Sequence, residues 1–327
     1  MERPILLDES VFDETFMPER LVGREGQVEQ IARCLKPAKV GKSIKNLYIY
    51  GSPGVGKTIV TRWILNEHFD KISVYINCWN KRTSHKIMEE VLLQMGYVVH
   101  GKESTSELVK KFEKSKRKPI VCLDESDHMK DAEILYVLAR NSCGMILISN
   151  QAFALSSVDH RIKSSLFLEE VEFKPYKKDE IFEILRERAS YGLRQNSVND
   201  HLLQIVSAMS GGDARVGLQT LKIAAKDAES KGLETVTIEE VKSASKCARK
   251  YRLSYLLGKL SEPQRAIYDV LKKYRAMSSG RLFQECSKAS KHTLVDRSYR
   301  NYMQKMEELG LVRKHGSGRW KRYEIVV

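Results

Sequence analysis

The segment that decides the fold is Gly51-Ser52-Pro53-Gly54-Val55-Gly56-Lys57-Thr58, which fits the phosphate-loop pattern G-x-x-x-x-G-K-[ST]. It follows the apolar run Leu47–Tyr50, which is typical of a buried parallel strand, and a helix is expected from Thr58 to Glu67. The glycines let backbone N–H groups surround a β-phosphate, and the helix N-terminus adds the positive end of its dipole. Lys57 is expected to reach the β- and γ-phosphates, and the Thr58 hydroxyl is expected to bind Mg²⁺.

A phosphate loop alone could belong to a kinase or a GTPase, and two acidic residues favour nucleotide hydrolysis. The apolar run Ile120–Leu123 ends in Asp124 and Glu125. One of these acids can hold Mg²⁺ and the next can polarise an attacking water. Asn150 follows the apolar run at 145–149 and could reach the γ-phosphate or its water.

Strand-like and helix-like segments alternate through the first half of the chain. Further apolar runs typical of strands occur at 72–77, 119–124, 145–150 and 166–173, and helical patterns occur at 84–95 and 131–141. This alternation predicts a parallel α/β sheet. From about Pro175 the strands stop, and a small helical domain is expected, with helices at 178–189, 199–209, 213–228 and 238–248.

Residues 255–327 predict a domain of a third kind. Three helices are expected, at 261–274, 280–288 and 296–309. Ser261 and Gln264 suggest a capping box at the start of the first helix, and Gly310 ends the third. The turn at 315–318 then predicts a β-hairpin. Three helices followed by a hairpin are typical of a winged-helix DNA-binding domain.

The charge of the chain also points to a polyanionic partner. Its 56 Lys and Arg against 42 Asp and Glu leave a net charge of +14. Residues 251–327 hold 17 of the basic and 7 of the acidic side chains, a balance of +10. A positive charge concentrated in one domain is typical of nucleic-acid binding.

The third helix of this domain has one apolar and one polar face. Tyr299, Met303, Met306 and Leu309 recur at three- and four-residue steps and should face the core. The candidate DNA-binding residues are the polar side chains of that helix and of the hairpin: Arg297, Arg300, Asn301, Lys305, Lys314, Arg319, Lys321 and Arg322.

The composition excludes several other classes of protein. Hydrophobic residues make up 42% of the chain and charged residues 30%, which indicates a folded protein. No run of eighteen apolar residues and no signal-peptide pattern occurs, so a cytoplasmic protein with no membrane partner is expected. The six cysteines form no C-x-x-C pair and the histidines no H-E-x-x-H motif, which argues against a zinc site or a disulfide framework.

Taken in order, these motifs resemble the archaeal origin-recognition initiators, AAA+ ATPases related to eukaryotic origin recognition complex subunits. The resemblance includes the phrase Gly211-Gly212-Asp213-Ala214-Arg215 and covers nearly the whole chain from Pro18 onward. It implies three domains: an AAA+ base at 1–173, a helical lid at 174–250 and a winged helix at 251–327. It also implies ATP or ADP and Mg²⁺ as cofactors, slow ATP hydrolysis and a nucleoid-associated location. The implied partners are duplex origin DNA, other initiator subunits and the replicative helicase.

The resemblance assigns roles to single residues. Asp124 matches the metal-binding acid, Glu125 the water-activating acid, and Asn150 the sensor 1 position. Arg215 matches the sensor 2 arginine of the lid, and Arg161 is a candidate for the arginine that acts on a neighbouring subunit. The remaining expected nucleotide contacts, besides the phosphate loop at 51–58, are Leu21, Val22 and Ile59. The segment after Asn77 resembles the place where initiators carry an extra DNA-facing helix.

Three other interpretations remain open. The chain could be a DNA-binding regulator whose nucleotide site is a passive switch, although Glu125 argues against this. It could be a clamp-loader-like motor, although such a motor would not need a basic winged helix. It could also be a mobile-element ATPase that couples a phosphate loop to a winged helix, and the phrase at 211–215 argues against that.

Overall fold

The computed structural model describes residues 4–151, 160–258, 260–289 and 294–326. The chain divides into two units, one formed by Glu14–Glu180 and the other by Met1–Asp13 together with Ile181–Val327. No helix within the described ranges is both long and apolar enough to cross a membrane.

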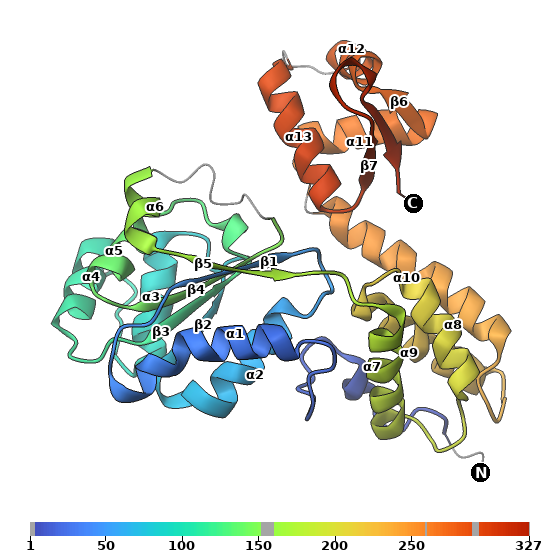
Figure 1. The fold of residues 1–327 in the computed structure, drawn as a ribbon, viewed down its shortest axis with the longest axis horizontal. Coiled ribbons are helices and arrows are strands. Elements are labelled where there is room, and N and C mark those ends of the chain that lie inside the picture. Colours follow the sequence, from blue (N-terminus) through green and yellow to red (C-terminus); the bar gives the residue numbers. More distant parts are fainter. Residues whose placement is uncertain (1–3, 152–159, 259, 290–293, 327) are drawn as a thin grey trace. The chain divides into compact units, whose positions relative to one another are not determined.

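A five-stranded parallel sheet organises the first unit (Figure 1), with the strand order β2-β3-β4-β1-β5. The strands are β1 (Leu47–Gly51), β2 (Ser73–Asn77), β3 (Ile120–Asp124), β4 (Gly144–Ser149) and β5 (Glu169–Phe173). Because all strands run the same way, their carboxyl ends share one edge of the sheet. The phosphate loop after β1, the acids at the end of β3 and Asn150 after β4 therefore lie along that edge.

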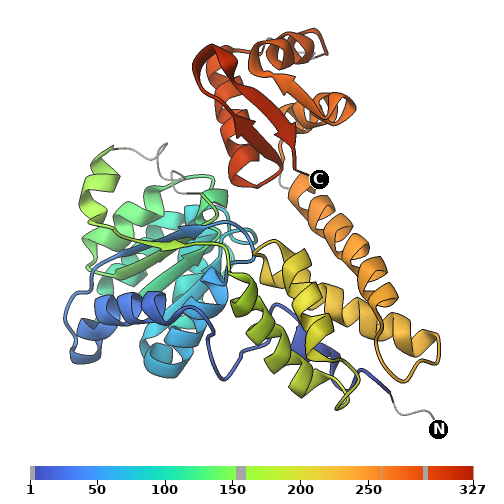
Figure 2. The ribbon, with the colours of Figure 1, turned by 45° about the vertical axis from the view of Figure 1, so that its right-hand side comes forward.

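Helices cover both faces of this sheet, as Figures 1 and 2 show. Successive strand residues face opposite sides, and apolar residues occupy both. In β1, Leu47 and Ile49 belong to one buried cluster, whereas Tyr48 belongs to the other. The first cluster includes residues of α1 (Glu25–Leu35) and α2 (Lys57–Phe69). The second includes residues of α3 (Ser84–Gln94), α4 (Thr105–Lys114) and α5 (Glu133–Arg140). The predicted α/β fold class is confirmed.

Some elements of this unit differ from expectation. The strand expected at 166–173 begins only at Glu169, because Leu166 ends helix α6 (His160–Leu166). Phe167 follows with a positive φ of 43°, a conformation that neither a helix nor a strand can continue through. Helices α1, α4 and α6 were not predicted, although α4 carries a capping box in which Glu107 Oε2 accepts the Ser104 N–H at 2.7 Å.

Four helices form the lid part of the second unit: α7 (Lys178–Gly192), α8 (Asp200–Ser210), α9 (Ala214–Ser230) and α10 (Ile238–Gly258). Asn199 caps α8, since its Oδ1 accepts the Leu202 N–H at 2.9 Å, and Asp213 caps α9 in the same way. Helix α10 continues ten residues past its expected end. The domain limit expected after residue 250 therefore falls inside a continuous helix.

An N-terminal segment, residues 4–13, belongs to this second unit, although residues 1–173 were expected to form one domain. Its side chains Ile5 and Phe12 are buried. The Arg194 N–H donates to the Ile5 carbonyl at 2.8 Å, and Lys222 Nζ donates to Asp13 Oδ1 at 2.9 Å. The segment includes the 3₁₀ turn η1 (Glu9–Phe12), which packs against α9.

The C-terminal part has three helices and a three-stranded antiparallel sheet (Figure 2), with the strand order β6-β8-β7. Its elements are α11 (Glu262–Tyr274), β6 (Ala276–Ser278), α12 (Ser279–Ala289), α13 (Asp296–Glu308), β7 (Val312–His315), η6 (Gly318–Trp320) and β8 (Arg322–Ile325). Strand β6 was not predicted. The expected core face of α13 is confirmed, because Tyr299, Met303, Met306 and Leu309 are all buried. The three helices and the hairpin expected in this part of the chain are present in the expected order.

Replacing Phe12 by alanine should destabilise the second unit by about 3–5 kcal/mol, because a buried phenyl ring is lost and a cavity remains. Hydrogen exchange measured by mass spectrometry should rise in α7 and α9, with β3 and β4 unchanged. Leu7→Ala is the matched control: this side chain is 60% exposed, so its change in unfolding free energy should stay within about 0.5 kcal/mol. Equal effects of the two variants would show that the segment is not part of the core.

Candidate nucleotide site and nucleic-acid interface

The carboxylate of Asp124 is the most constrained group at the sheet edge. It is only 2% exposed and accepts three hydrogen bonds. Its Oδ2 accepts from Thr58 Oγ1 at 2.8 Å and from the Tyr75 hydroxyl at 2.6 Å, and its Oδ1 accepts from the Glu125 N–H at 2.8 Å. The structure thus brings together the two residues expected to bind Mg²⁺, Thr58 and Asp124, and fixes their orientation.

Tyr75 was not predicted as a site residue. It lies in β2 opposite Cys122 of β3, and this pairing carries its hydroxyl to Asp124. Burial, and then the nearby Asp124 carboxylate, raise the pKa of Tyr75 well above its usual value. The hydroxyl therefore stays protonated and donates. The sequence holds no signal for this contact, because it depends on which strand lies beside β3.

Lys57 is the first residue of α2, directly after Gly56 of the phosphate loop, and is buried. Its Nζ donates to the carbonyls of Gly51 at 2.8 Å and Ser52 at 3.0 Å, and to Asn150 Oδ1 at 3.0 Å. Three acceptors match the three N–H groups of an ammonium. Asn150 follows β4 and was expected to reach the γ-phosphate. Its contact with Lys57 places it beside the side chain expected to reach the same phosphate.

Glu125 has an uncommon backbone conformation, with φ 52° and ψ 43°. Non-glycine residues adopt this left-handed region only where the surroundings impose it. Here the next three residues form the turn η4 (Ser126–His128), and the His128 N–H donates to the Glu125 carbonyl at 2.9 Å. Ser126 Oγ donates to the Ile148 carbonyl at 3.0 Å, and the His128 ring meets the Trp79 ring edge to face at 4.6 Å. These contacts hold Glu125 at the end of β3.

A buried arginine, Arg24, stabilises the phosphate loop by hydrogen bonding to its backbone. Its Nε donates to the Val55 carbonyl at 3.0 Å, and its Nη2 donates to the Lys174 carbonyl at 2.7 Å. Its guanidinium also stacks on Tyr176, 3.7 Å from the ring centroid. A Cβ on Gly56 would lie 2.4 Å from the Tyr176 hydroxyl oxygen, and Gly56 has a φ of +91°, so only glycine fits there.

Arg24 and Tyr176 were also missed as site residues. The signal that could have indicated Arg24 is its place between Gly23 and Glu25, directly before α1. The expected adenine-side residues Leu21 and Val22 are half-buried nearby in sequence, and Leu21 packs against the core cluster that contains Val55.

Two arginines were also expected to act at a nucleotide, Arg215 as the sensor 2 residue and Arg161 on the site of a neighbouring subunit. Arg215 lies in the first turn of α9, in the second unit, where its backbone N–H donates to Asp213 Oδ1. Arg161 belongs to α6, but its side chain lies outside the described part of the chain. Among the predicted residues, the direct contacts described above therefore join Lys57 to Asn150 and Thr58 to Asp124.

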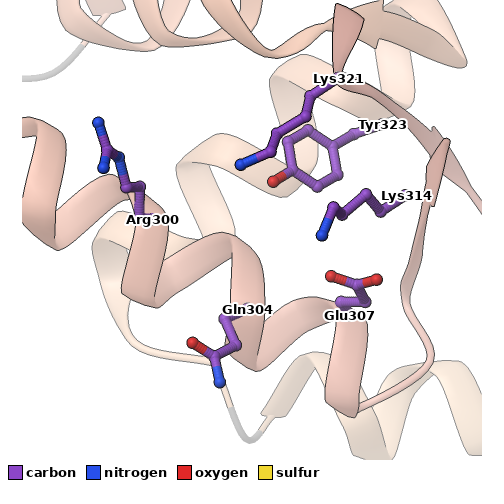
Figure 3. A pocket seen from close by; sticks show the side chains of 6 residues that line it. All are labelled: Arg300, Gln304, Glu307, Lys314, Lys321 and Tyr323. Carbon is purple, nitrogen blue, oxygen red and sulfur yellow. The ribbon is translucent and has the colours of Figure 1, made fainter. Parts of the chain in front are cut away.

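A groove of about 430 Å³ lies between α13 and the hairpin (Figure 3). It is lined by Arg300, Gln304, Glu307, Lys314, Lys321 and Tyr323. Three of these, Arg300, Lys314 and Lys321, were predicted to bind DNA. Glu307 was not, and Figure 3 shows its carboxylate facing the Lys314 ammonium.

The other predicted DNA-binding residues are not among the described residues that line this groove. Arg297, Asn301 and Arg322 are exposed and Lys305 is half-buried, whereas the Arg319 side chain lies outside the described part of the chain. Arg300 also pairs with Asp296, one turn earlier on the same helix.

Arg24→Ala should weaken nucleotide binding, because the Val55 and Lys174 carbonyls lose a charged donor and an unsatisfied buried acceptor costs about 1–3 kcal/mol. A fluorescent ATP analogue would measure the affinity. Arg33→Ala is the control: Arg33 forms an exposed ion pair with Glu169 at 3.5 Å, so its loss should change little. Equal nucleotide affinity in both variants would show that Arg24 does not support the loop.

Comparison with known proteins identifies two domains of the chain. Residues 42–156 match the model of the AAA domain, and residues 182–246 match the Cdc6 AAA+ ATPase-type lid domain. Two solved structures from Aeropyrum pernix share the fold. The ORC2 protein in ADPNP-ADP complexes has a TM-score of 0.73 and 22% identity, covering 98% of this chain and 94% of that one. The ORC1 protein in complex with DNA has a TM-score of 0.73 and 24% identity, covering 99% and 94%.

Curated relatives also align with most of this chain. The ORC1-type DNA replication protein 1 of Sulfurisphaera tokodaii is 30% identical over 329 residues, which is 91% of this chain and 83% of the relative. That of Halobacterium salinarum is 28% identical over 293 residues, which is 85% of this chain and 94% of the relative. The chain therefore belongs to the archaeal ORC1-type family of replication initiators, which carry an AAA+ domain and a Cdc6-type lid.

Proposed function

We propose that this protein is an ATP-dependent replication initiator that binds duplex origin DNA and helps to recruit the replicative helicase. The observation that carries the proposal is the set of contacts at the sheet edge, Lys57 to Asn150 and Thr58 to Asp124, in a chain that also ends in a basic winged helix. The relatives named as ORC1-type replication proteins, and the ORC1 structure in complex with DNA, support it.

The phosphate loop is the proposed site for ATP or ADP. Lys57 would hold the β- and γ-phosphates. The Thr58 hydroxyl and the Asp124 carboxylate are oxygen donors of the kind that Mg²⁺ prefers, and they already lie 2.8 Å apart. When bound there, Mg²⁺ would neutralise charge that develops on the phosphate oxygens.

Glu125 is the proposed general base. Its backbone places it one residue beyond Asp124, where a carboxylate can accept a proton from an attacking water. Asn150 would orient that water or the γ-phosphate. Arg161 would act on the site of a neighbouring subunit, so hydrolysis by an isolated chain is expected to be slow. Arg215 would report the nucleotide state to the lid.

Glu125→Gln should keep nucleotide affinity but lower phosphate release at least about 100-fold, because an amide keeps the shape of the side chain and cannot accept the proton. A fluorescent ATP analogue and a phosphate-release assay would measure the two quantities. The exposed Glu67→Gln on α2 is the control and should retain both. Lys57→Ala should lose binding itself. Unchanged phosphate release in Glu125→Gln would favour a nucleotide switch that does not depend on turnover.

The groove between α13 and the hairpin is the proposed centre of the DNA interface. Arg300 and Asn301 lie on the exposed face of α13 and can contact base edges with two hydrogen bonds each. Lys314 and Lys321 come from the hairpin and would contact phosphates, which positions the protein without selecting a sequence. An initiator of this kind would work on the chromosome together with other initiator subunits.

Substitutions in helix and hairpin should have different effects on DNA binding. A preferred duplex would first be selected from a random library. Asn301→Ala should then cost about 1–3 kcal/mol on that duplex and much less on random DNA. Lys321→Ala should weaken both alike and reduce the slope of log affinity against log salt by about one. The exposed Lys272→Ala on α11 is the control. If Asn301→Ala weakened both duplexes by the same factor, α13 would not be the element that reads the sequence.

A further inference from the structure

An exposed tryptophan stands in the turn of the hairpin. Trp320 is 88% exposed, the largest exposed fraction among the described large hydrophobic side chains. It is absent from the buried cluster of the C-terminal domain, in which Tyr323, three residues later, takes part. The winged-helix fold therefore makes no use of the indole for its core.

The backbone around Trp320 is nevertheless well anchored. On one side, the Trp320 N–H donates to the Ser317 carbonyl at 3.2 Å, closing the turn η6. A Cβ on Gly316, whose φ is +71°, would lie 2.8 Å from the Trp320 carbonyl oxygen, so the chain passes tightly beneath it. On the other side, the Lys321 carbonyl accepts the Ser279 N–H at 2.8 Å. The indole is thus presented from a fixed backbone, and a partner need not order the loop.

The surroundings of the indole are cationic. Lys321 follows it directly and lines the groove with Lys314 and Arg300, and Arg322 comes next in β8. Positive charge around an exposed aromatic ring suits a polyanion that also offers flat apolar surfaces. Nucleic acid has both, because phosphates attract lysine and arginine while bases stack on aromatic rings.

We propose that Trp320 contacts the bases of duplex DNA by wedging at a flexible base step beside the segment read by α13. This inference rests on the proposed function and names a finer property of its DNA substrate. Apolar side chains inserted at a base step unstack it and kink the duplex, and pyrimidine–purine steps open most easily. Trp320 would therefore select deformable DNA without hydrogen-bonding to any base.

The test uses the full chain and two duplexes of equal length and base composition, one rich in TA and TG steps and one built from A-tracts. Trp320→Ala should lower affinity for the step-rich duplex about 10-fold and for the A-tract duplex much less, while Trp320→Phe keeps most of it. The slope against salt should not change, since no phosphate contact is lost. Tyr274→Ala is the matched control, because Tyr274 is an exposed aromatic residue (43%) of the same domain, near Lys273 and Arg281.

A second readout reports the base step directly. With 2-aminopurine placed at the central TA step, the wild-type chain should raise its fluorescence as the base unstacks, and Trp320→Ala should not. If Trp320→Ala matches the wild type on both duplexes and in 2-aminopurine fluorescence, the wedge is wrong and the proposed DNA binding still stands. The wedge is also wrong if Trp320→Ala changes only self-association in gel filtration. If the wild-type chain binds neither duplex even at low salt, the proposed DNA binding itself fails.

Discussion

The nucleotide site depends on one buried carboxylate, that of Asp124. A carboxylate removed from water is costly unless donors surround it. Its donors come from α2 (Thr58), from β2 (Tyr75) and from the backbone of the next residue, so they meet only when β2 pairs with β3 in register and α2 begins at Lys57. The strand order, the start of α2 and the geometry of the proposed Mg²⁺ site therefore depend on one another. A shift of one residue in β2 would remove a donor and leave the Asp124 charge less well compensated.

The groups around this carboxylate are held by contacts from outside the site. Arg24 fixes the phosphate loop through the Val55 carbonyl, and the η4 turn fixes Glu125 in a left-handed conformation. Strained backbone at a functional residue persists when several contacts impose it. The Ser126 bond to Ile148 belongs to this support, because it ties the acid after β3 to the neighbouring strand β4. The residues proposed to act on the nucleotide are thus positioned by contacts with neighbouring side chains and backbone.

The features that depend on local sequence patterns could be predicted from the sequence. The phosphate loop, the acids after β3, Asn150 and the three winged-helix helices follow from motifs or periodicity within about fifteen residues. Tyr75 and Arg24 could not be found in this way, because their partners Asp124 and Val55 become neighbours only through the order of the strands. The length of α10 was not predicted for a related reason. Leu256, near the end of α10, packs into the core of the next domain, so the apolar periodicity gives no sign of a domain boundary within the helix.

The N-terminal segment has a consequence for protein synthesis. The segment that carries Ile5 and Phe12 contacts elements that follow residue 177, so in the sequence the whole nucleotide-binding unit is inserted between two parts of the other unit. At about 5–20 residues per second, a ribosome needs roughly 10 to 40 seconds to pass from this segment to the end of α9. The nucleotide-binding unit has all of its residues once Glu180 has been made, while two large apolar side chains still wait for partners that extend to Ser230. Ile5 and Phe12 therefore remain accessible to chaperones until α9 has been synthesised.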